Sequence, residues 1–99
     1  MISKGSVAVV TGGSKGIGLA IAESLVRNGS SVFICGRGKR DVAAALERLR
    51  AIGDAAGETC DVRSEDQVRQ MLEEAERVFG GVDILVNNAG IGIMGKTVE

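Results

Sequence analysis

A glycine-rich loop directly follows the first apolar run of the chain, and its residue types suit the binding of phosphates. The sequence T-G-G-S-K-G-I-G occupies positions 11–18, between an apolar run at 7–10 and a helical pattern that begins near position 16. Glycines let a backbone come close to a pyrophosphate, and the free N–H groups at the start of a helix bind anions. We expect Gly12 to permit the tight turn, Gly16 the approach of the phosphates, and Gly18 the packing of helix on sheet. The loop therefore predicts a dinucleotide site that contains Gly12, Ser14, Lys15, Gly16, Ile17 and Gly18.

A basic residue follows the second apolar run, at the position where a dinucleotide-binding fold distinguishes NAD from NADP. An acidic residue there binds the ribose 2′-hydroxyl, whereas an arginine accommodates a 2′-phosphate. This chain has C-G-R at 35–37, with Arg37 standing 19 residues after Gly18, and no acid at the position. Lys15 adds a second positive charge, and charge-assisted hydrogen bonds to phosphate are strong. We therefore predict NADP(H) as the cofactor; the alternative, a solvated basic turn over 37–40, is disfavoured by the place of Arg37 in the fold.

Four apolar runs alternate with three helical patterns along the chain. The runs lie at 7–10, 32–35, 57–60 and 82–86, and the helical patterns lie at 16–28, 42–52 and 64–79. This β-α-β-α-β-α-β order favours a parallel sheet with right-handed crossovers and helices on its faces. We predict an α/β fold, namely a partial Rossmann fold with a four-stranded parallel sheet of order 3-2-1-4 and three helices. The first two helices should cover one face and the third helix the other.

Local signals predict the ends and the buried faces of the helices. The first helix should be followed by Gly29, a natural C-terminal cap. Ser64 should start the third helix in a capping box with Gln67. Glu73 and Arg77 should lie on its outer face at a spacing of i, i+4, which indicates solvated helix surface rather than a site. The buried stripe predicted for the first helix consists of Ile17, Ala20, Ile21, Ser24 and Leu25.

Three motifs stand in order at the ends of the predicted strands. They are T-G-x-x-x-G-x-G at 11–18, D-V at 61–62 and N-N-A-G at 87–90. With these motifs the sequence resembles the short-chain dehydrogenase/reductase family, over essentially the whole chain but only the first part of the family's pattern. The resemblance implies cofactor contacts from Asp61, to the adenine amino group, and from Val62, and an approach of the nicotinamide-side ribose to Ala89 and Gly90. Asn88 is implied either in a cofactor contact or as a tie between strands, and Asp61 could instead be an acid that precedes the third helix.

The reaction of this family depends on residues that the chain lacks. The resemblance implies hydride transfer between a nicotinamide and a carbonyl or alcohol, with a tyrosine as acid/base and a lysine of a Y-x-x-x-K motif that lowers the tyrosine pKa. The chain contains no tyrosine, and nine residues follow Gly90. Lys96 has no partner acid or phenol, so we do not expect it to act as a catalyst. No catalytic residue is therefore predicted.

Two hypotheses about the whole chain follow. In the first, residues 1–99 are the N-terminal dinucleotide-binding portion of an NADP(H)-dependent reductase, resembling 3-oxoacyl-[acyl-carrier-protein] reductases, whose catalytic C-terminal portion is absent. The alternative is a non-catalytic nucleotide-binding or self-associating Rossmann module. A Y-x-x-x-K segment further along the encoding DNA would favour the first. In either case the apolar run at 82–86 would be an unpaired sheet edge, so we expect a homo-oligomer.

Composition argues against several other classes of protein. The net charge of −1 provides no basic surface for nucleic acid, and no apolar run approaches the ~20 residues that span a membrane. The N-terminal segment before the loop is too short for a signal peptide, so we expect a cytoplasmic protein. Cys35 and Cys60 lie 25 residues apart and the chain has no histidine. We therefore predict no metal site, and we expect two reduced, partly buried thiols.

Overall fold

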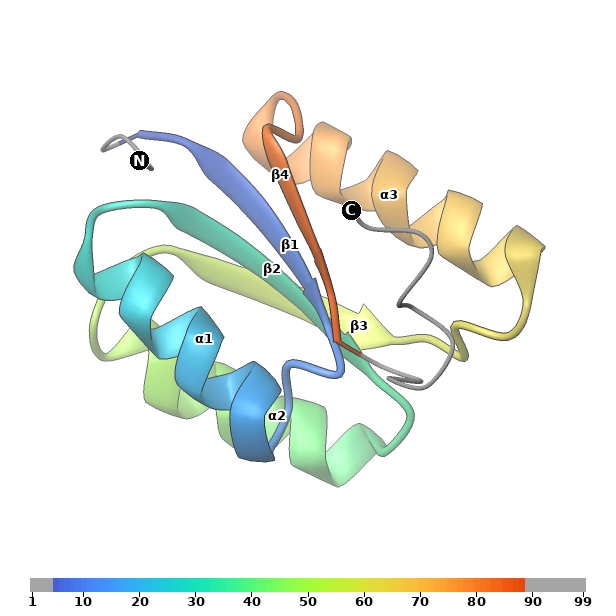
Figure 1. The fold of residues 1–99 in the computed structure, drawn as a ribbon, viewed down its shortest axis with the longest axis horizontal. Helices are drawn as coiled ribbons and strands as arrows, with labels where there is room; N and C mark the ends of the chain where they lie inside the picture. The colour runs from blue at the N-terminus through green and yellow to red at the C-terminus, as the bar shows by residue number, and fades with distance from the viewer. Residues whose placement is uncertain (1–4, 89–99) are drawn as a thin grey trace.

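The four apolar runs form one parallel sheet, and the helices connect its strands. The structure is a computed structural model, and it describes residues 5–88 of the 99-residue chain. The strand order is β3-β2-β1-β4 and all neighbouring strands are parallel, so the predicted 3-2-1-4 sheet is confirmed (Figure 1). The elements are β1 (Val7–Thr11), α1 (Gly16–Arg27), β2 (Ser31–Gly36), α2 (Lys39–Arg50), β3 (Ala55–Thr59), α3 (Glu65–Phe79) and β4 (Ile84–Asn87).

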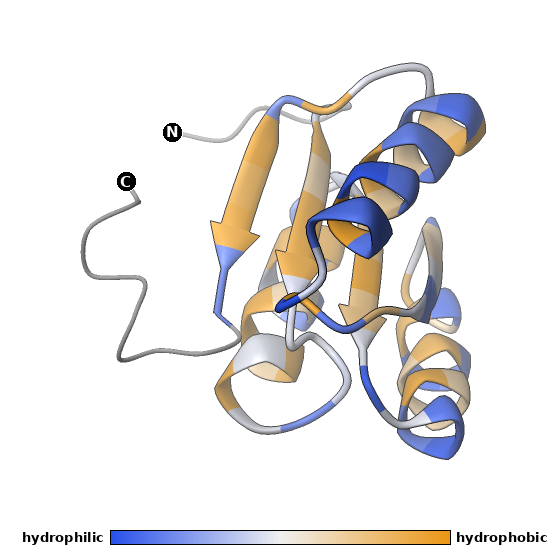
Figure 2. Cartoon of the chain, turned by 90° about the vertical axis from the view of Figure 1, so that its right-hand side faces the viewer, coloured by the Kyte–Doolittle hydropathy of each residue, from blue (hydrophilic) through white to orange (hydrophobic). Residues whose placement is uncertain are grey.

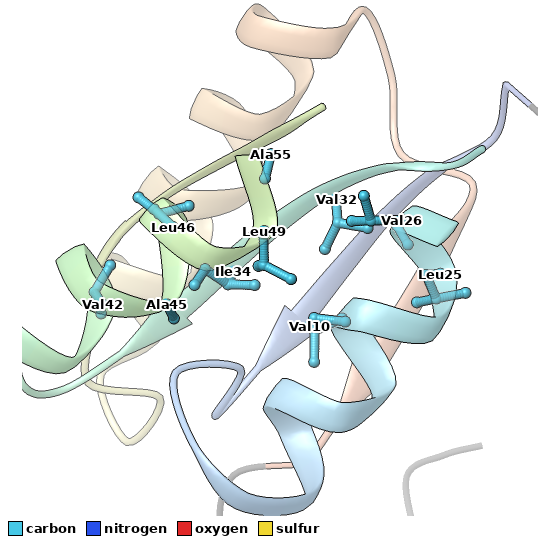
Figure 3. Close-up of a cluster of buried hydrophobic side chains, with 12 residues drawn as sticks. Val10, Leu25, Val26, Val32, Ile34, Val42, Ala45, Leu46, Leu49 and Ala55 are labelled. Atoms are coloured by element: carbon cyan, nitrogen blue, oxygen red, sulfur yellow. The ribbon is translucent and has the colours of Figure 1, made fainter. Parts of the chain in front are cut away.

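Alternate side chains of each strand pack against helices on opposite faces of the sheet. As predicted, α1 and α2 lie on one face and α3 lies on the other (Figure 1). Val10 and Ile34 pack with Leu49 on the first face (Figure 3), and Phe33 packs with Met71 on the second. The strands are mostly apolar along their length, as expected of a sheet covered on both faces (Figure 2). Within residues 5–88 no helix is long and apolar enough to cross a membrane.

Two strands begin two residues away from the predicted position, whereas the bounds of the other two differ by one residue at most at either end. β3 begins at Ala55 rather than at position 57, because its small residues pair with β2 from the first residue onward. At Gly57 a Cβ would lie 2.5 Å from a carbonyl oxygen of β2, so close strand packing requires small residues there. β4 begins at Ile84, because Asp83 makes two hydrogen bonds of 2.8 Å to the backbone of Val7, one through its N–H and one through its carboxylate. Small or polar residues at strand ends give a weak hydropathy signal, so their positions were predicted poorly.

The buried face of α1 differs from the predicted stripe. The helix buries Gly18, Ala22, Leu25 and Val26, whereas Ile17 is 67% exposed. Of the predicted stripe only Leu25 is buried. The small residues at 18 and 22 let the helix come close to the sheet, and this contact turns the larger side chain at position 17 away from the core. Ile17 is therefore accessible at the start of α1.

The predicted capping box of α3 is half correct. Ser64 Oγ accepts a hydrogen bond from the Gln67 N–H at 3.3 Å, as predicted. The Gln67 side chain, however, accepts a hydrogen bond from the Asp61 N–H at 2.8 Å, because the Ser64 N–H already donates to the Asp61 carbonyl oxygen. Gln67 thus links the turn that carries Asp61 to the first turn of α3.

Two further local predictions are confirmed. Gly29 follows the C-cap residue Asn28 with φ of +93°, the left-handed conformation expected of a glycine just past a helix. Glu73 and Arg77 are both exposed on α3, as predicted, and the Arg77 guanidinium binds Glu74, with Nε 3.0 Å from Oε1. Spacings of three and four residues both make side chains neighbours on a helix, so the sequence did not decide between the two acids.

Candidate functional site

The loop between β1 and α1 turns sharply at the end of the strand. Gly12 and Gly16 have φ angles of +65° and +59°, a conformation that residues with a side chain rarely adopt. A Cβ at Gly18 would lie 1.9 Å from the Gly12 carbonyl oxygen, so the start of α1 packs directly on the loop backbone. The tight turn and the close helix packing expected from the glycine spacing are therefore both present.

The first turn of α1 presents backbone N–H groups beside this loop. Lys15 is the N-cap residue and makes no side-chain capping hydrogen bond, and the first turn holds no acidic residue. A helix N-terminus without a side-chain cap has free N–H groups and the positive end of the helix dipole, and both suit an anion. Gly16, Ile17 and Gly18 form this turn, so three of the predicted residues lie where a phosphate can reach the helix.

A groove of about 700 Å³ lies at the carboxyl ends of β1, β2 and β3. In open α/β sheets, ligands bind in the crevice beyond the carboxyl ends of the strands. The predicted residues that line this groove come from three different connections, and they are Gly12, Ser14, Lys15, Arg37, Asp61 and Val62. The structure thus brings together the glycine-rich loop, the residue after β2 and the turn after β3.

Two thiols and a serine form an uncharged floor in this groove. Cys35, in β2, and Cys60, just after β3, are buried free thiols that belong to the same packed cluster. Burial first, and then the neighbouring Cys60, raises the pKa of the Cys35 thiol to about 12, so it is neutral at physiological pH. Ser14 is buried against Gly36, where a Cβ would lie 2.6 Å from Ser14 Oγ. The charged groups of the groove therefore stand at its rim.

Three cations line the groove, and they differ in their partners. Arg63 binds both carboxylate oxygens of Asp61, with Nε–Oδ1 and Nη2–Oδ2 distances of 3.0 and 2.9 Å. Lys15 Nζ lies 3.4 Å from Asp41 Oδ2. Arg37 is exposed and makes no ion pair within residues 5–88. Among the groove cations in this part of the chain, Arg37 thus has its charge available to a ligand.

Asp61 is kept ionised by its arginine neighbours. Hydrogen bonds from the side chain and the N–H of Arg63 lower the pKa of Asp61 to about 2, and the charge of Arg37 adds to this effect. Since the folded-state pKa lies below the ordinary value of 3.8, the carboxylate stabilises the fold above that pH, and the contribution is lost as the pH falls toward 2. At neutral pH Asp61 is a pure acceptor, which suits a hydrogen bond from an amino group.

The carboxyl end of β4 is tied to β1 through Thr11. The Thr11 hydroxyl accepts a hydrogen bond from the Asn88 N–H at 2.8 Å, and it lies 3.1 Å from a side-chain oxygen of β4. The Asn88 side-chain nitrogen stands 2.8 Å from the position that a Cβ would take at Gly18. The backbone of Asn88 therefore ties the two strands, while its amide faces the start of α1. Ala89 and Gly90, also predicted for the site, lie outside the described residues.

Comparison with protein families accounts for this combination of fold and loop. The sequence pattern of the short chain dehydrogenase family matches residues 6–99, which is nearly the whole chain. The chain belongs to the short chain dehydrogenase family. The resemblance carried by the glycine-rich loop, the D-V pair and the N-N-A-G motif is thereby confirmed. The family match extends through both strand-end motifs as well as the loop.

Relatives within the short chain dehydrogenase family are considerably longer. A ketoacyl reductase of Streptomyces coelicolor is 45% identical over 94 residues, which cover 94% of this chain and 36% of that protein. A crystal structure of an actinorhodin polyketide ketoreductase variant with NADPH has a TM-score of 0.84 and 41% identity, over 90% of this chain and 35% of that one. The Pseudomonas aeruginosa RhlG/NADP active-site complex has a TM-score of 0.81 and 42% identity, over 88% and 35% of the two chains. The chain thus spans about a third of the length of these relatives.

Several residues that line the groove were not predicted from the sequence. Asp41 stands four residues after Arg37, in the first turn of α2, and Arg63 stands two residues after Asp61. The opposite charges at these short spacings were a signal that could have been used. Spacing alone, however, does not say which way a side chain in a turn points. The other lining residues that were missed are Cys35, Gly36, Gly38 and Cys60.

Proposed function

We propose that residues 1–99 are the NADP(H)-binding portion of a short chain oxidoreductase that acts on a carbonyl or alcohol. The observation that carries this proposal is the exposed Arg37, which stands without an ion pair within residues 5–88 at the rim of a groove with a neutral floor. An arginine at the end of the second strand suits a 2′-phosphate. The first turn of α1, which no side chain caps, offers the second anion site that a dinucleotide requires.

The groove offers a matching group for each part of the cofactor. Backbone N–H groups of the first turn of α1 suit the pyrophosphate, with the exposed Ile17 as an apolar neighbour. Arg37 and Lys15 suit the 2′-phosphate, and Asp61 and Val62 suit the adenine, with the carboxylate accepting from the amino group. We assign the nicotinamide-side ribose to Asn88, Ala89 and Gly90. When bound, the cofactor supplies or accepts the hydride.

Known relatives support both the cofactor and the class of substrate. The actinorhodin ketoreductase structure holds NADPH and the RhlG structure holds NADP. The actinorhodin protein is named a ketoreductase and the Streptomyces coelicolor protein a ketoacyl reductase. We therefore propose a ketone, or the corresponding alcohol, as the substrate of the complete oxidoreductase. The greater part of each relative lies beyond the matched region, and we place substrate selection there.

We expect the 99-residue chain to bind NADPH but not to oxidise it. It contains no tyrosine, so the phenol that the family uses as acid/base is not available. Saturable quenching or enhancement of NADPH fluorescence should report binding. Addition of ethyl acetoacetate or an acetoacetyl thioester should then leave the absorbance of the reduced nicotinamide unchanged over hours. A steady, ketone-dependent loss of that absorbance would contradict the proposal. If the Lys96→Met variant no longer showed this loss, Lys96 would be the unexpected catalyst.

The edge of the sheet at β4 supports self-association as a second property. Among the described strands β4 pairs only with β1, and its Leu85 is 49% exposed. Exposed apolar strand edges promote pairing with another chain. We therefore propose that this chain forms a homo-oligomer through β4. Self-association of this kind is also what the alternative hypothesis, a non-catalytic Rossmann module, predicts.

Leu85→Lys should weaken this self-association. The change places a charge on the exposed edge and removes an apolar side chain whose burial contributes about 1.5–3 kcal/mol, so we expect the dissociation constant to rise by about tenfold or more. Light scattering across a concentration series measures it. Val78→Lys is the matched control, because Val78 is 41% exposed but lies on α3. A monomeric unaltered chain at high concentration, or equal effects of the two variants, would contradict assembly through β4.

A further inference from the structure

The Asp41 carboxylate lies between the glycine-rich loop and the start of α2, on the wall of the groove. Asp41 is in the first turn of α2, whose N-cap residue Gly38 has no side chain. The Oδ2 atom of Asp41 lies 3.4 Å from Lys15 Nζ and 2.9 Å from the position that a Cβ would take at Gly38. Asp41, Lys15 and Arg37 all line the groove. The Asp41 carboxylate therefore contacts the Lys15 ammonium group. Lys15 and Arg37 are the two cations assigned to the 2′-phosphate.

The contact between Lys15 and Asp41 is easier to break than the other ion pair of the groove. The two side chains are 78% and 49% exposed, and one nitrogen–oxygen contact joins them. Exposed pairs of this kind contribute little to stability. Asp61, in contrast, is held by two side-chain hydrogen bonds from Arg63 in a bidentate arrangement. An incoming anion can therefore displace Asp41 from Lys15 more readily than it can displace Asp61 from Arg63.

We propose that Asp41 is a specificity-determining residue that competes with the 2′-phosphate of the cofactor for Lys15. The inference rests on the proposed function. When a 2′-phosphate binds between Lys15 and Arg37, Asp41 loses its cation and remains close to the phosphate, and like charges at short range repel. Asp41 thus lowers the affinity for 2′-phosphorylated ligands and leaves the affinity for unphosphorylated ones unchanged. The preference for NADPH over NADH is therefore smaller than Arg37 and Lys15 alone would produce.

Calorimetric titration of the chain with adenosine 2′,5′-bisphosphate and with adenosine 5′-monophosphate tests this competition. Low ionic strength is used because exposed charges are then least screened. For Asp41→Asn we expect the bisphosphate to bind about fivefold tighter, and the monophosphate affinity to change by less than about twofold. Asp41→Ser, which also removes the charge and keeps a polar residue near the helix start, should act in the same direction.

A matched control variant and a background that lacks the Lys15 ammonium group test whether the effect of Asp41 acts through Lys15. Asp66 also lies in the first turn of a helix and pairs with an arginine, Arg69, but it does not line the groove. Asp66→Asn should therefore change neither affinity. In a Lys15→Met background the gain from Asp41→Asn should shrink, because there is no ammonium group to release.

The possible results separate this inference from the proposed function. Tighter bisphosphate binding in both Asp41 variants, reduced in the Lys15→Met background, supports competition for Lys15. Unchanged or weaker bisphosphate binding in variants that keep the circular dichroism spectrum overturns it, and so does an equal gain for the monophosphate. If the unaltered chain binds the monophosphate and the bisphosphate equally, or binds neither, the proposed function fails and the inference fails with it.

Discussion

Replacement of Arg37 by aspartate should reverse the cofactor preference of the chain. Arg37 is the cation of the groove that forms no ion pair within residues 5–88, so its whole charge can interact with a 2′-phosphate. A hydrogen bond to a charged group contributes about 1.5–3 kcal/mol, and an aspartate would add repulsion. We expect the affinity for NADPH to fall about 100-fold, roughly 2.7 kcal/mol. The affinity for NADH should be retained or improved, because an acid at this position accepts a hydrogen bond from the ribose 2′-hydroxyl.

Calorimetric titrations of Arg37→Asp with NADPH and with NADH measure both affinities. Arg40→Asp is the matched control, because Arg40 is exposed in the first turn of α2 and does not line the groove. The same change of charge there should weaken NADPH binding by less than about threefold, since exposed charges act weakly at a distance in salt. If Arg37→Asp bound NADPH as tightly as the unaltered chain, or if the control lost as much affinity, Arg37 would not be the phosphate ligand.

Gly18→Ala should destabilise the fold and weaken cofactor binding together. The new Cβ would lie 1.9 Å from the carbonyl oxygen and 2.7 Å from the carbonyl carbon of Gly12. Both are backbone atoms, so no change of rotamer relieves the contact. Overpacking costs about 1–3 kcal/mol, and we expect about 3 kcal/mol here because α1 must move away from the loop. That is a large part of the roughly 5–15 kcal/mol by which domains are stable.

Urea denaturation followed by circular dichroism measures this loss of stability. Gly81→Ala is the control, because a Cβ at Gly81 would meet no atom within 4 Å and its φ is not positive. Its unfolding free energy should stay within about 0.5 kcal/mol of the unaltered chain. Fluorescence titration should show that NADPH binding falls in Gly18→Ala alone. Equal unfolding midpoints for the two variants would show that α1 does not pack on the loop as described.

The arrangement of the sheet could be predicted because the hydropathy of its residues indicates directly which segments are buried. Continuous apolar runs such as the one with Val9 and Val10 indicate strands covered on both faces, and those two side chains do enter opposite clusters. The orientation of α1 could not be predicted in the same way. Gly18 and Ala22 face the sheet because they are small, while hydropathy favoured the larger Ile17, which is exposed.

The backbone of the candidate site was easier to predict than its charges. The turn at Gly12 requires a left-handed conformation, so the glycine spacing alone indicated where the loop would bend. The pairing of Asp41 with Lys15 and of Arg63 with Asp61 depends on side-chain directions in two turns. Those directions follow from how the turns pack on the sheet, and no spacing in the sequence encodes them.

The ratio of the dissociation constants for NADPH and NADH tests most directly whether this groove selects a 2′-phosphate. Both ligands are titrated calorimetrically into the unaltered chain in one buffer of low ionic strength. We expect NADPH to bind at least about tenfold tighter, because a charge-assisted contact contributes about 1.5–3 kcal/mol and each 1.4 kcal/mol corresponds to roughly tenfold. Equal affinities, or tighter binding of NADH, would contradict the role assigned to Arg37 and with it the NADP(H) site.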